Sequence, residues 1–210
     1  MFDGAGFGQS SEDTRLVEAL RRGEEAAFSA LLDRYYPAMM RLALTYVHSR
    51  AVAEEVVQET WLALLQGLAR FEFRSSLRTW IFRILTNRAK TRGQRESRYV
   101  PFDRVGDDNL PEVPPERFGA IDHHWVTPPR NWEEPPEETT LAQETRASIQ
   151  RAITTLPFNQ RVVITLRDME GWTAEEVCHL LELSAANQRV LLHRARSTVR
   201  RVLEEYFAQV

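Results

Sequence analysis

Apolar residues recur at helical spacing in two separate stretches of the chain, over residues 28–85 and 149–199. In the first stretch, four stripes at residues 28–35, 39–46, 52–64 and 77–85 have the spacing of helices that bury one face. Pro37 is expected to separate the first two helices, because proline lacks an amide proton and clashes with the preceding turn. The third helix should end near Gly67, and Ser75 or Ser76 should cap the fourth. The pattern therefore predicts a four-helix module.

The second stretch predicts shorter helices with defined boundaries. Stripes at residues 149–156 and 162–169 are ended by Pro157 and Gly171. Thr173 and Glu176 have the spacing of a capping box, in which each side chain accepts a hydrogen bond from the other residue's amide, so a helix begins there. That helix ends shortly before Ser184, which can cap the next one. Two helices joined by so short a turn are typical of a helix-turn-helix.

The region between the two stretches has little apolar periodicity. Eight of the ten prolines lie between residues 101 and 136, which favours an extended linker over residues 99–145. The predicted fold class is all-α, with a four-helix N-terminal domain over residues 12–98 and a helix-turn-helix domain over residues 146–210. Residues 1–11 are expected to form a flexible N-terminus.

Charge is distributed unevenly along the chain, although its net value is only -3. Residues 70–98 carry nine basic side chains and two carboxylates, a net charge of +7. Residues 99–145 carry three basic side chains and eleven carboxylates, a net charge of -8. The compact basic block predicts a surface that binds a polyanion, and the acidic linker predicts a segment that avoids or mimics one.

The basic block falls on the helix expected from residue 77 onward. Its cations repel one another unless a polyanion neutralises them, and a phosphate backbone is the usual one. Phe71, Phe73 and Trp80 lie beside these cations and offer ring faces on which unpaired bases can stack. The alternative is that Trp80 belongs to the core and that the arginines form an ordinary solvated surface.

The helix after Ser184 predicts a second nucleic-acid surface. Asn187, Gln188 and Arg189 occupy the positions from which a recognition helix contacts base edges in the major groove. Arg194 and Arg200 would suit phosphates. Residues at helical spacing should form an exposed stripe along the same helix, namely Ala186, Arg189, His193, Arg196 and Arg200. The alternative is a helical hairpin with a cationic surface and no DNA-binding role.

The composition excludes several other chemistries. Cys178 is the only cysteine, so an intrachain disulfide and a cysteine metal cluster are excluded. No apolar run approaches the length of a membrane span, and the first residues lack the basic-then-apolar layout of a secretory signal. We therefore expect a cytoplasmic protein without a metal, a cofactor or membrane insertion.

Several segments resemble bacterial sigma factors. EEVVQETW at residues 54–61 resembles their core-polymerase-binding segment, and FRSSLRTWIFRI at residues 73–84 resembles their promoter-melting segment. LP at 156–157, QR at 160–161, GWT at 171–173 and LHRAR at 192–196 resemble the domain that binds the -35 element. Two domains without further ones fit the extracytoplasmic-function (ECF) class.

The resemblance implies a protein that binds core RNA polymerase, recognises the -35 and -10 promoter elements and helps to melt the -10 region. It implies no catalytic residue. The clamp helices of the largest polymerase subunit would contact Glu54, Glu55, Val57, Gln58, Glu59 and Trp61. Single-stranded -10 DNA would contact the loop at residues 69–76 and the helix after it, through Phe71, Phe73, Arg74, Ser75, Ser76, Arg78, Trp80, Arg83, Asn87 and Arg88. Double-stranded -35 DNA would contact Ala186, Asn187, Gln188, Arg189, His193, Arg194, Arg196 and Arg200.

The resemblance also implies further partners and one departure from the family pattern. The flap of the second-largest polymerase subunit and an anti-sigma factor are partners common in this class. Gln188 stands where the family often has an aliphatic residue facing the core, so Gln188 is either a base contact or part of a slightly rotated helix. Trp125 and Trp132 are unusual in a polar linker, and we expect them to anchor it to polymerase or to one of the two domains. The alternative is that both tryptophans are only weakly docked.

Three other classes of protein fit the sequence less well than this family. A helix-turn-helix regulator that acts without polymerase would leave the basic block unexplained. A nuclease using Glu54, Glu55 and Glu59 would lack a second acidic cluster and a catalytic base. An adaptor that binds only proteins would not bind promoter DNA.

Overall fold

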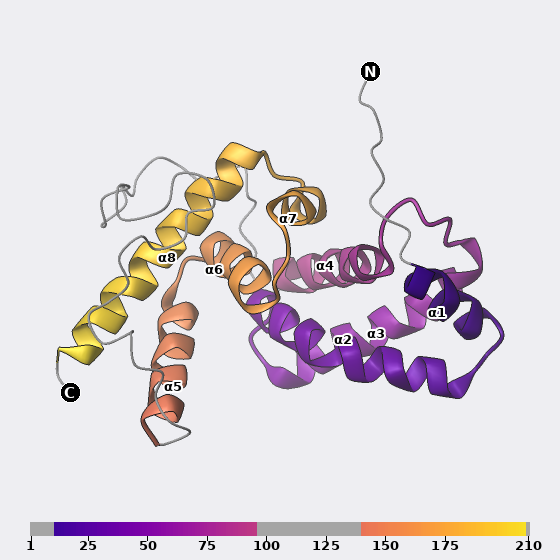
Figure 1. Ribbon diagram of the computed structural model, residues 1–210, viewed down its shortest axis with the longest axis horizontal. Helices are drawn as coiled ribbons and strands as arrows, with labels where there is room; N and C mark the ends of the chain where they lie inside the picture. Colours follow the sequence, from indigo (N-terminus) through magenta and orange to yellow (C-terminus); the bar gives the residue numbers. More distant parts are fainter. Residues whose placement is uncertain (1–10, 96–139, 209–210) are drawn as a thin grey trace. The chain divides into compact units, whose positions relative to one another are not determined.

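The structure is a computed structural model that describes residues 11–95 and 140–208 (Figure 1). All regular secondary structure in these two ranges is helical, which confirms the predicted all-α class. The chain divides into two compact units, with the division between Tyr99 and Val100. Most of the predicted linker, including Trp125 and Trp132, lies outside the described residues.

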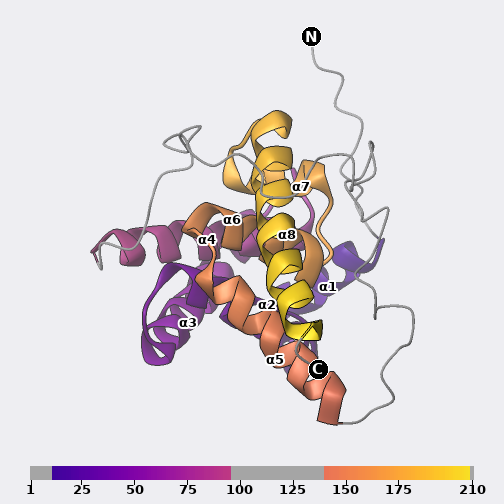
Figure 2. The same cartoon turned by 90° about the vertical axis from the view of Figure 1, so that its left-hand side faces the viewer.

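The N-terminal unit contains four α-helices and a short 3-10 helix. α1 covers Ser11–Arg21, α2 Glu25–Tyr46, α3 Arg50–Gly67, η1 Leu68–Arg70 and α4 Leu77–Arg95. α2, α3 and α4 pack against one another, and α1 packs on α2 (Figures 1 and 2). Their core consists of apolar side chains that are less than 2% exposed, among them Leu31, Met39, Leu42, Leu64, Leu77, Ile81 and Leu85. One side of α4 is thereby buried and the other is left at the surface.

α2 runs unbroken through Pro37, so the predicted break at this residue is wrong. A proline in a helix interior removes one hydrogen bond to the carbonyl four residues earlier. Pro37 and Asp33 are both exposed, so water can satisfy the carbonyl that this leaves free. Tyr35 and Met39, on either side, are buried, and their burial holds the two halves in one helix. The four helices of the unit are therefore completed by α1, which formed none of the predicted stripes.

The C-terminal unit is built around its longest helix, α8 (Ala185–Phe207). α5 (Thr140–Thr155), α6 (Phe158–Ile164) and α7 (Ala174–Leu181) all pack against α8 (Figure 2). α6 continues into a π-helical turn, η4 (Thr165–Met169), and the chain then turns at Gly171, whose φ of +66° suits glycine. Trp172 follows at once and is 1% exposed, so the turn delivers a large side chain into the core.

The predicted capping box and helix-turn-helix are both present. Thr173 Oγ1 accepts a hydrogen bond from the Glu176 amide at 3.2 Å, and Glu176 Oε2 accepts one from the Thr173 amide at 2.8 Å. α7 ends at Leu181, and the next residue, Glu182, has a left-handed φ of +59°. Ser184 Oγ then accepts from the Asn187 amide at 3.1 Å and caps α8. Local hydrogen bonds therefore define both ends of the turn.

Two arginines that were predicted to be exposed on α8 are buried, so this part of the prediction is wrong. Arg196 makes a two-point contact with Asp168 of η4, with Nη2–Oδ1 at 2.7 Å and Nε–Oδ2 at 2.8 Å. Arg200 has a fully buried side chain, and its Nε donates to Glu204 Oε1 at 2.8 Å. Each guanidinium has a carboxylate partner in the same unit, which compensates part of the cost of removing its charge from water.

Removal of the Asp168 carboxylate should destabilise the C-terminal unit. Asp168→Ala removes the two-point contact with the buried guanidinium of Arg196, and hydrogen bonds to a charged group are worth about 1.5–3 kcal/mol. The free energy of unfolding should fall by about that amount. Urea unfolding followed by circular dichroism measures this loss. The double variant Asp168→Leu with Arg196→Met should recover most of it, because neither charge then remains.

Glu205→Ala is the matched control, because it breaks the exposed pair with Arg201 on the same unit. It should change the free energy of unfolding by less than about 0.5 kcal/mol. Equal effects of Asp168→Ala and Glu205→Ala would show that the Asp168–Arg196 pair has no special structural role.

Candidate nucleic-acid interface

Three aromatic rings meet at the segment between η1 and α4, residues 71–76, which we name the aromatic loop. The Phe71 ring stacks on Trp80, with 4.6 Å between centroids and 30° between planes, and the Phe73 ring lies 4.9 Å from that of Phe71. Gly67 leaves room for this stack, since a Cβ there would lie 3.1 Å from the Trp80 ring. Phe71 is only 6% exposed, whereas Phe73 and Trp80 are half-buried. Phe71 therefore supports the stack, and the other two rings have accessible surface.

The polar residues of the aromatic loop have two different roles. Arg74 is exposed, and its guanidinium forms an ion pair of 2.6 Å with Glu72. Ser76 Oγ accepts a hydrogen bond from the Thr79 amide at 3.1 Å, which confirms Ser76 as the predicted cap of α4. Ser75 is half-buried, and its hydroxyl lies 3.4 Å from the Ser76 carbonyl. The loop thus exposes one cation, Arg74, and its last residue, Ser76, caps α4.

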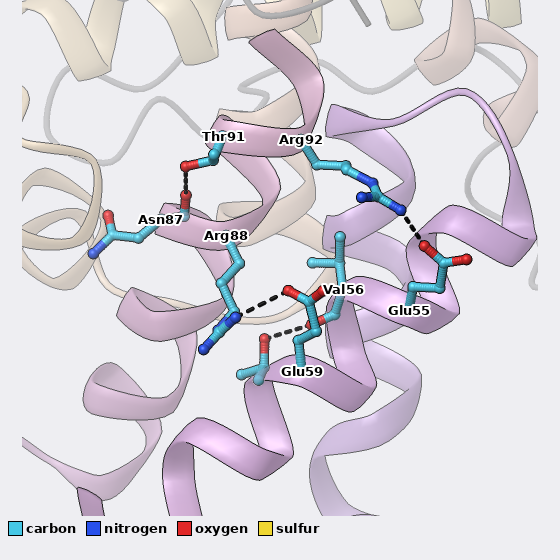
Figure 3. Close-up of polar contacts among 8 residues, drawn as sticks. Glu55, Val56, Glu59, Asn87, Arg88, Thr91 and Arg92 are labelled. Atoms are coloured by element: carbon cyan, nitrogen blue, oxygen red, sulfur yellow. Dashed lines mark hydrogen bonds and ion pairs between the residues drawn. The ribbon is translucent and has the colours of Figure 1, made fainter. Parts of the chain in front are cut away.

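The cations of α4 fall into two groups. Arg83 and the neighbouring Asn87 are exposed to solvent, whereas Arg78 is half-buried. Arg88 and Arg92 instead reach across to α3 (Figure 3). Arg88 Nη1 contacts Glu59 Oε2 at 2.9 Å, and Arg92 Nη2 contacts Glu55 Oε2. Carboxylates predicted to contact polymerase therefore neutralise arginines of the basic block.

A groove of about 430 Å³ follows this line of contact between α3 and α4. Glu59 lies in its wall on α3, and Asn87, Arg88, Thr91, Arg92 and Arg95 lie in its wall on α4. The Asn87 side chain points away from the two ion pairs (Figure 3). The backbone carbonyl of Asn87 accepts a hydrogen bond from Thr91 Oγ1 at 3.0 Å. Thr91, Arg92 and Arg95 were not among the predicted site residues, although their spacing along the basic helix could have indicated them.

The predicted polymerase-binding residues of α3 are partly at the surface and partly in the core. Glu54, paired with Arg50 at 2.9 Å, is half-buried, and Gln58 is exposed. Val57 and Trp61 are buried, so both are corrected to core residues. They lie on the side of α3 that packs on other helices, where the Trp61 ring meets that of Phe28 edge to face with 6.0 Å between centroids.

Two leucines extend the exposed face of α3 and were missed in the sequence. Leu62 and Leu65 are 60% and 46% exposed, one and two turns beyond Gln58. Their position relative to the polar residues at 55, 58 and 59 was visible in the sequence, but their apolar character suggested a core role. An exposed apolar pair beside a polar surface is typical of a face that binds another protein.

The beginning of α8 presents fewer residues than predicted. Ala186 and Arg189 are exposed, and Asn187 is half-buried. Gln188 is 2% exposed, so it faces the core and is corrected from a candidate base contact. The alternative of a rotated helix is not needed, since Gln188 occupies the inward position itself. Val190 is 44% exposed and joins this surface, although its apolar character gave no such indication.

Further along α8, His193 and Arg194 are half-buried.

Burial raises the pKa of the Cys178 thiol on α7, and it also raises the pKa of Tyr35 in the N-terminal unit. Within residues 11–95 and 140–208, no group of three or more His, Cys, Asp and Glu residues could hold a metal ion. In the same ranges, no helix is long and apolar enough to cross a membrane.

Together these surfaces define a DNA-binding protein of two helical modules, one with a helix-turn-helix and one with an aromatic loop beside a cationic helix. Residues 31–99 match the family model of sigma-70 region 2, and residues 146–199 match that of sigma-70 region 4. The RNA polymerase sigma-H factor of Pseudomonas aeruginosa is 28% identical over 193 residues, covering 92% of this chain and 94% of that protein. The ECF RNA polymerase sigma-E factor of Escherichia coli K12 is 30% identical over 190 residues, covering 89% and 92%.

Two solved structures share the fold at 20% identity. CnrH in complex with the cytosolic domain of CnrY has a TM-score of 0.57, covering 92% of this chain and 97% of that one. The sigma factor RpoE of Bartonella quintana in complex with the anti-sigma factor NepR has a TM-score of 0.55, covering 84% and 96%. The chain belongs to the ECF family of RNA polymerase sigma factors. It acts with core RNA polymerase in promoter recognition and transcription initiation, which sets aside a regulator that works without polymerase.

Removal of the two α3 carboxylates should strengthen DNA binding by the free protein. Glu55→Gln with Glu59→Gln releases Arg92 and Arg88, and each exposed ion pair is worth about 0.5 kcal/mol. We expect about fivefold tighter binding of single-stranded DNA in the absence of polymerase. The logarithm of the affinity should also fall more steeply with that of salt concentration, by about 0.7 for each arginine released. Fluorescence anisotropy across a salt series measures both quantities.

The control is Glu12→Gln with Glu24→Gln, which changes the net charge equally. These carboxylates pair with Arg34 and Arg22, and neither lines the groove between α3 and α4. If both double variants gained the same affinity, the effect would come from net charge and not from the ion pairs between α3 and α4.

Proposed function

We propose that the two units divide promoter recognition between them. The N-terminal unit, with residues 12–98 as its domain, binds core polymerase and the -10 element. The C-terminal domain, residues 146–210, binds the -35 element. The observation that carries this proposal is that the accessible rings of Phe73 and Trp80 lie in the same unit as the exposed Arg74 and Arg83, on the aromatic loop and α4.

The exposed face of α3 is the proposed contact with the clamp helices of the largest polymerase subunit. Its polar members are Glu54, Glu55, Gln58 and Glu59, and we add Leu62 and Leu65 at its C-terminal end. The exposure of the two leucines supports this proposal, because apolar surface gains free energy when a partner removes it from water. The flap of the second-largest subunit is the proposed contact of the C-terminal domain.

The aromatic loop and α4 are proposed to bind the single-stranded -10 element. Phe73 and Trp80 would stack on unpaired bases, with Phe71 as the support of the Trp80 ring. Ser76 would contribute through the shape of the loop, because its hydroxyl already caps α4. The polar contacts would come from Arg74, Ser75, Arg78, Arg83, Asn87 and Arg88.

The start of α8 is proposed to bind the -35 element in the major groove. Ala186, Asn187 and Arg189 would contact base edges, because the first residues of a recognition helix enter the groove. His193 and Arg194, further along the helix, would contact phosphates. Gln188, Arg196 and Arg200 would act indirectly, since their burial holds α8 in the unit.

We further propose that the protein catalyses no reaction itself and works in the cytoplasm, as sigma factors do. A sigma factor of similar fold is bound to the anti-sigma factor NepR, which supports control of this chain by a protein of that kind. Trp125 and Trp132 remain the proposed anchors of the acidic linker. If replacing both with alanine left transcription and the protease sensitivity of the linker unchanged, that role would be ruled out.

Run-off transcription with purified core polymerase and a library of genomic fragments tests the proposal. With the protein present, transcripts should begin at discrete sites that share sequences near -35 and -10. Arg189→Ala should lower -35-dependent transcription about tenfold, because a bidentate base contact is worth about 1–3 kcal/mol. The preference at -10 should not change.

Arg201→Ala is the control for Arg189→Ala, because Arg201 is an exposed arginine near the other end of the same helix. Start sites without shared upstream sequences would contradict the proposed division of promoter recognition. Equal losses in the two variants would contradict the role of the start of α8.

A further inference from the structure

α1 is connected to the aromatic loop through one arginine. Arg21 Nη2 donates a hydrogen bond to the Phe71 carbonyl at 2.7 Å, and Arg21 Nε donates to the Leu68 carbonyl at 3.2 Å. Its guanidinium carbon also lies 5.9 Å from the centroid of the Phe73 ring. One side chain of α1 therefore contacts the first residue of η1, Leu68, and both aromatic residues of the loop, Phe71 and Phe73.

α1 also reaches the other end of the aromatic loop. Asp13 Oδ2 accepts a hydrogen bond of 3.1 Å from the amide of Leu77, the first residue of α4. Asp13 is 9% exposed, so this contact is shielded from water. A negative charge at a helix N-terminus is also favoured by the helix dipole. Arg21 and Asp13, two turns apart on α1, thus hold the start and the end of the loop to the same helix.

The aromatic loop has a backbone conformation that requires such support. Phe73 has a φ of +56°, in the left-handed region that a bulky L-residue seldom adopts. Strained residues of this kind persist where surrounding contacts fix them, and they concentrate at functional sites. Phe73 has two such contacts, with the ring of Phe71 and with the cation of Arg21. Both depend on Phe71, whose carbonyl Arg21 also binds.

We propose that Arg21 is a positioning residue for base recognition, and that α1 is a brace for the aromatic loop. Arg21 sets where the rings of Phe73 and Trp80 lie, and so determines which bases of the -10 element stack well on them. Its Nε and Nη2 donate to backbone carbonyls of its own chain, so its main effect is on base preference. This inference rests on the proposed function of the aromatic loop.

A merely structural role for Arg21 makes a different prediction. If Arg21 only stabilised the N-terminal unit, its loss would reduce transcription from all promoters by a similar factor. If it positions the rings, its loss would change the preference among bases at particular -10 positions. Binding sites must be held to within about half an ångström to keep their selectivity. Base preference is therefore the readout that separates the two roles.

The experiment compares three variants of the full chain with core polymerase on the genomic-fragment library. Sequencing upstream of each transcript gives the base preference at every -10 and -35 position. Arg21→Ala should reduce about tenfold discrimination at one or two -10 positions to about twofold, and should leave the -35 positions unchanged. Arg21→Gln keeps one donor for a carbonyl and should give an intermediate result. Arg22→Ala removes only an exposed pair with Glu24 and should match the wild type.

An unchanged -10 preference in Arg21→Ala would overturn the inference, even if total transcription fell. If Arg21→Ala gave no transcripts, the variant would be tested on a template already melted over the -10 region, to separate the positioning role from a merely structural one. Restored transcription on that template would support the inference, and continued failure would overturn it.

Phe73→Gly separates this inference from the proposed function of the loop. Glycine adopts a φ of +56° without strain, so the variant removes the ring while the loop can keep its shape. An unchanged -10 preference in Phe73→Gly would contradict the loop's proposed role. A flattened preference in Phe73→Gly together with an unchanged one in Arg21→Ala would contradict the inference about Arg21 alone.

Discussion

The burial of one face of α4 is the constraint on which the N-terminal unit depends. Leu77, Ile81, Phe82 and Leu85 are completely buried among the neighbouring helices, and each such side chain contributes about 1.5–3 kcal/mol by leaving water. The charged side chains of α4 contribute less, since each of them is exposed or half-buried and stays in contact with water. The apolar face therefore fixes the rotation of the helix, and the cations occupy the positions that remain. The place of the aromatic loop follows, because the loop must join α3 to a helix that is already oriented.

Electrostatics then acts on a scaffold that packing has set. The basic block of the sequence is less basic as a surface than its composition indicates, because α3 supplies carboxylates to Arg88 and Arg92. Both pairs are well exposed, so they are weak and are screened by salt. The pair of Arg196 with Asp168 belongs to another class, because the Arg196 side chain is only 9% exposed, although that of Asp168 is 31% exposed. A buried guanidinium loses more than an exposed one when its carboxylate is removed. Arginines of similar spacing therefore form partly exposed pairs in one unit and a buried structural contact in the other.

Local signals in the sequence were sufficient for the fold class and the capping box at Thr173, because these depend on residues a few positions apart. They narrowed the cap of α4 to Ser75 or Ser76, and the hydrogen bond from the Thr79 amide assigns it to Ser76. Periodicity failed where tertiary burial outweighed a local preference, as at Pro37. It also failed for Arg196, because a buried arginine and an exposed one have the same place in a helical repeat. The partner that decides between them, Asp168, lies 28 residues away. The contacts of Arg21 with Leu68 and Phe71 join residues 47 and 50 positions apart, beyond the reach of any local pattern.

The length of α8 gives the C-terminal unit a mechanical property. α8 is a single helix from Ala185 to Phe207, and both its capped beginning and its buried later half belong to the same rod. Ala186 and Leu203 are about 25 Å apart along the axis, at about 1.5 Å per residue. A tilt of about 5° at Leu203 would therefore displace Ala186 by about 2 Å, most of the length of a hydrogen bond. Small packing changes at the far end of the helix are amplified at its beginning, so substitutions near Leu203 can move the residues proposed to contact the -35 element.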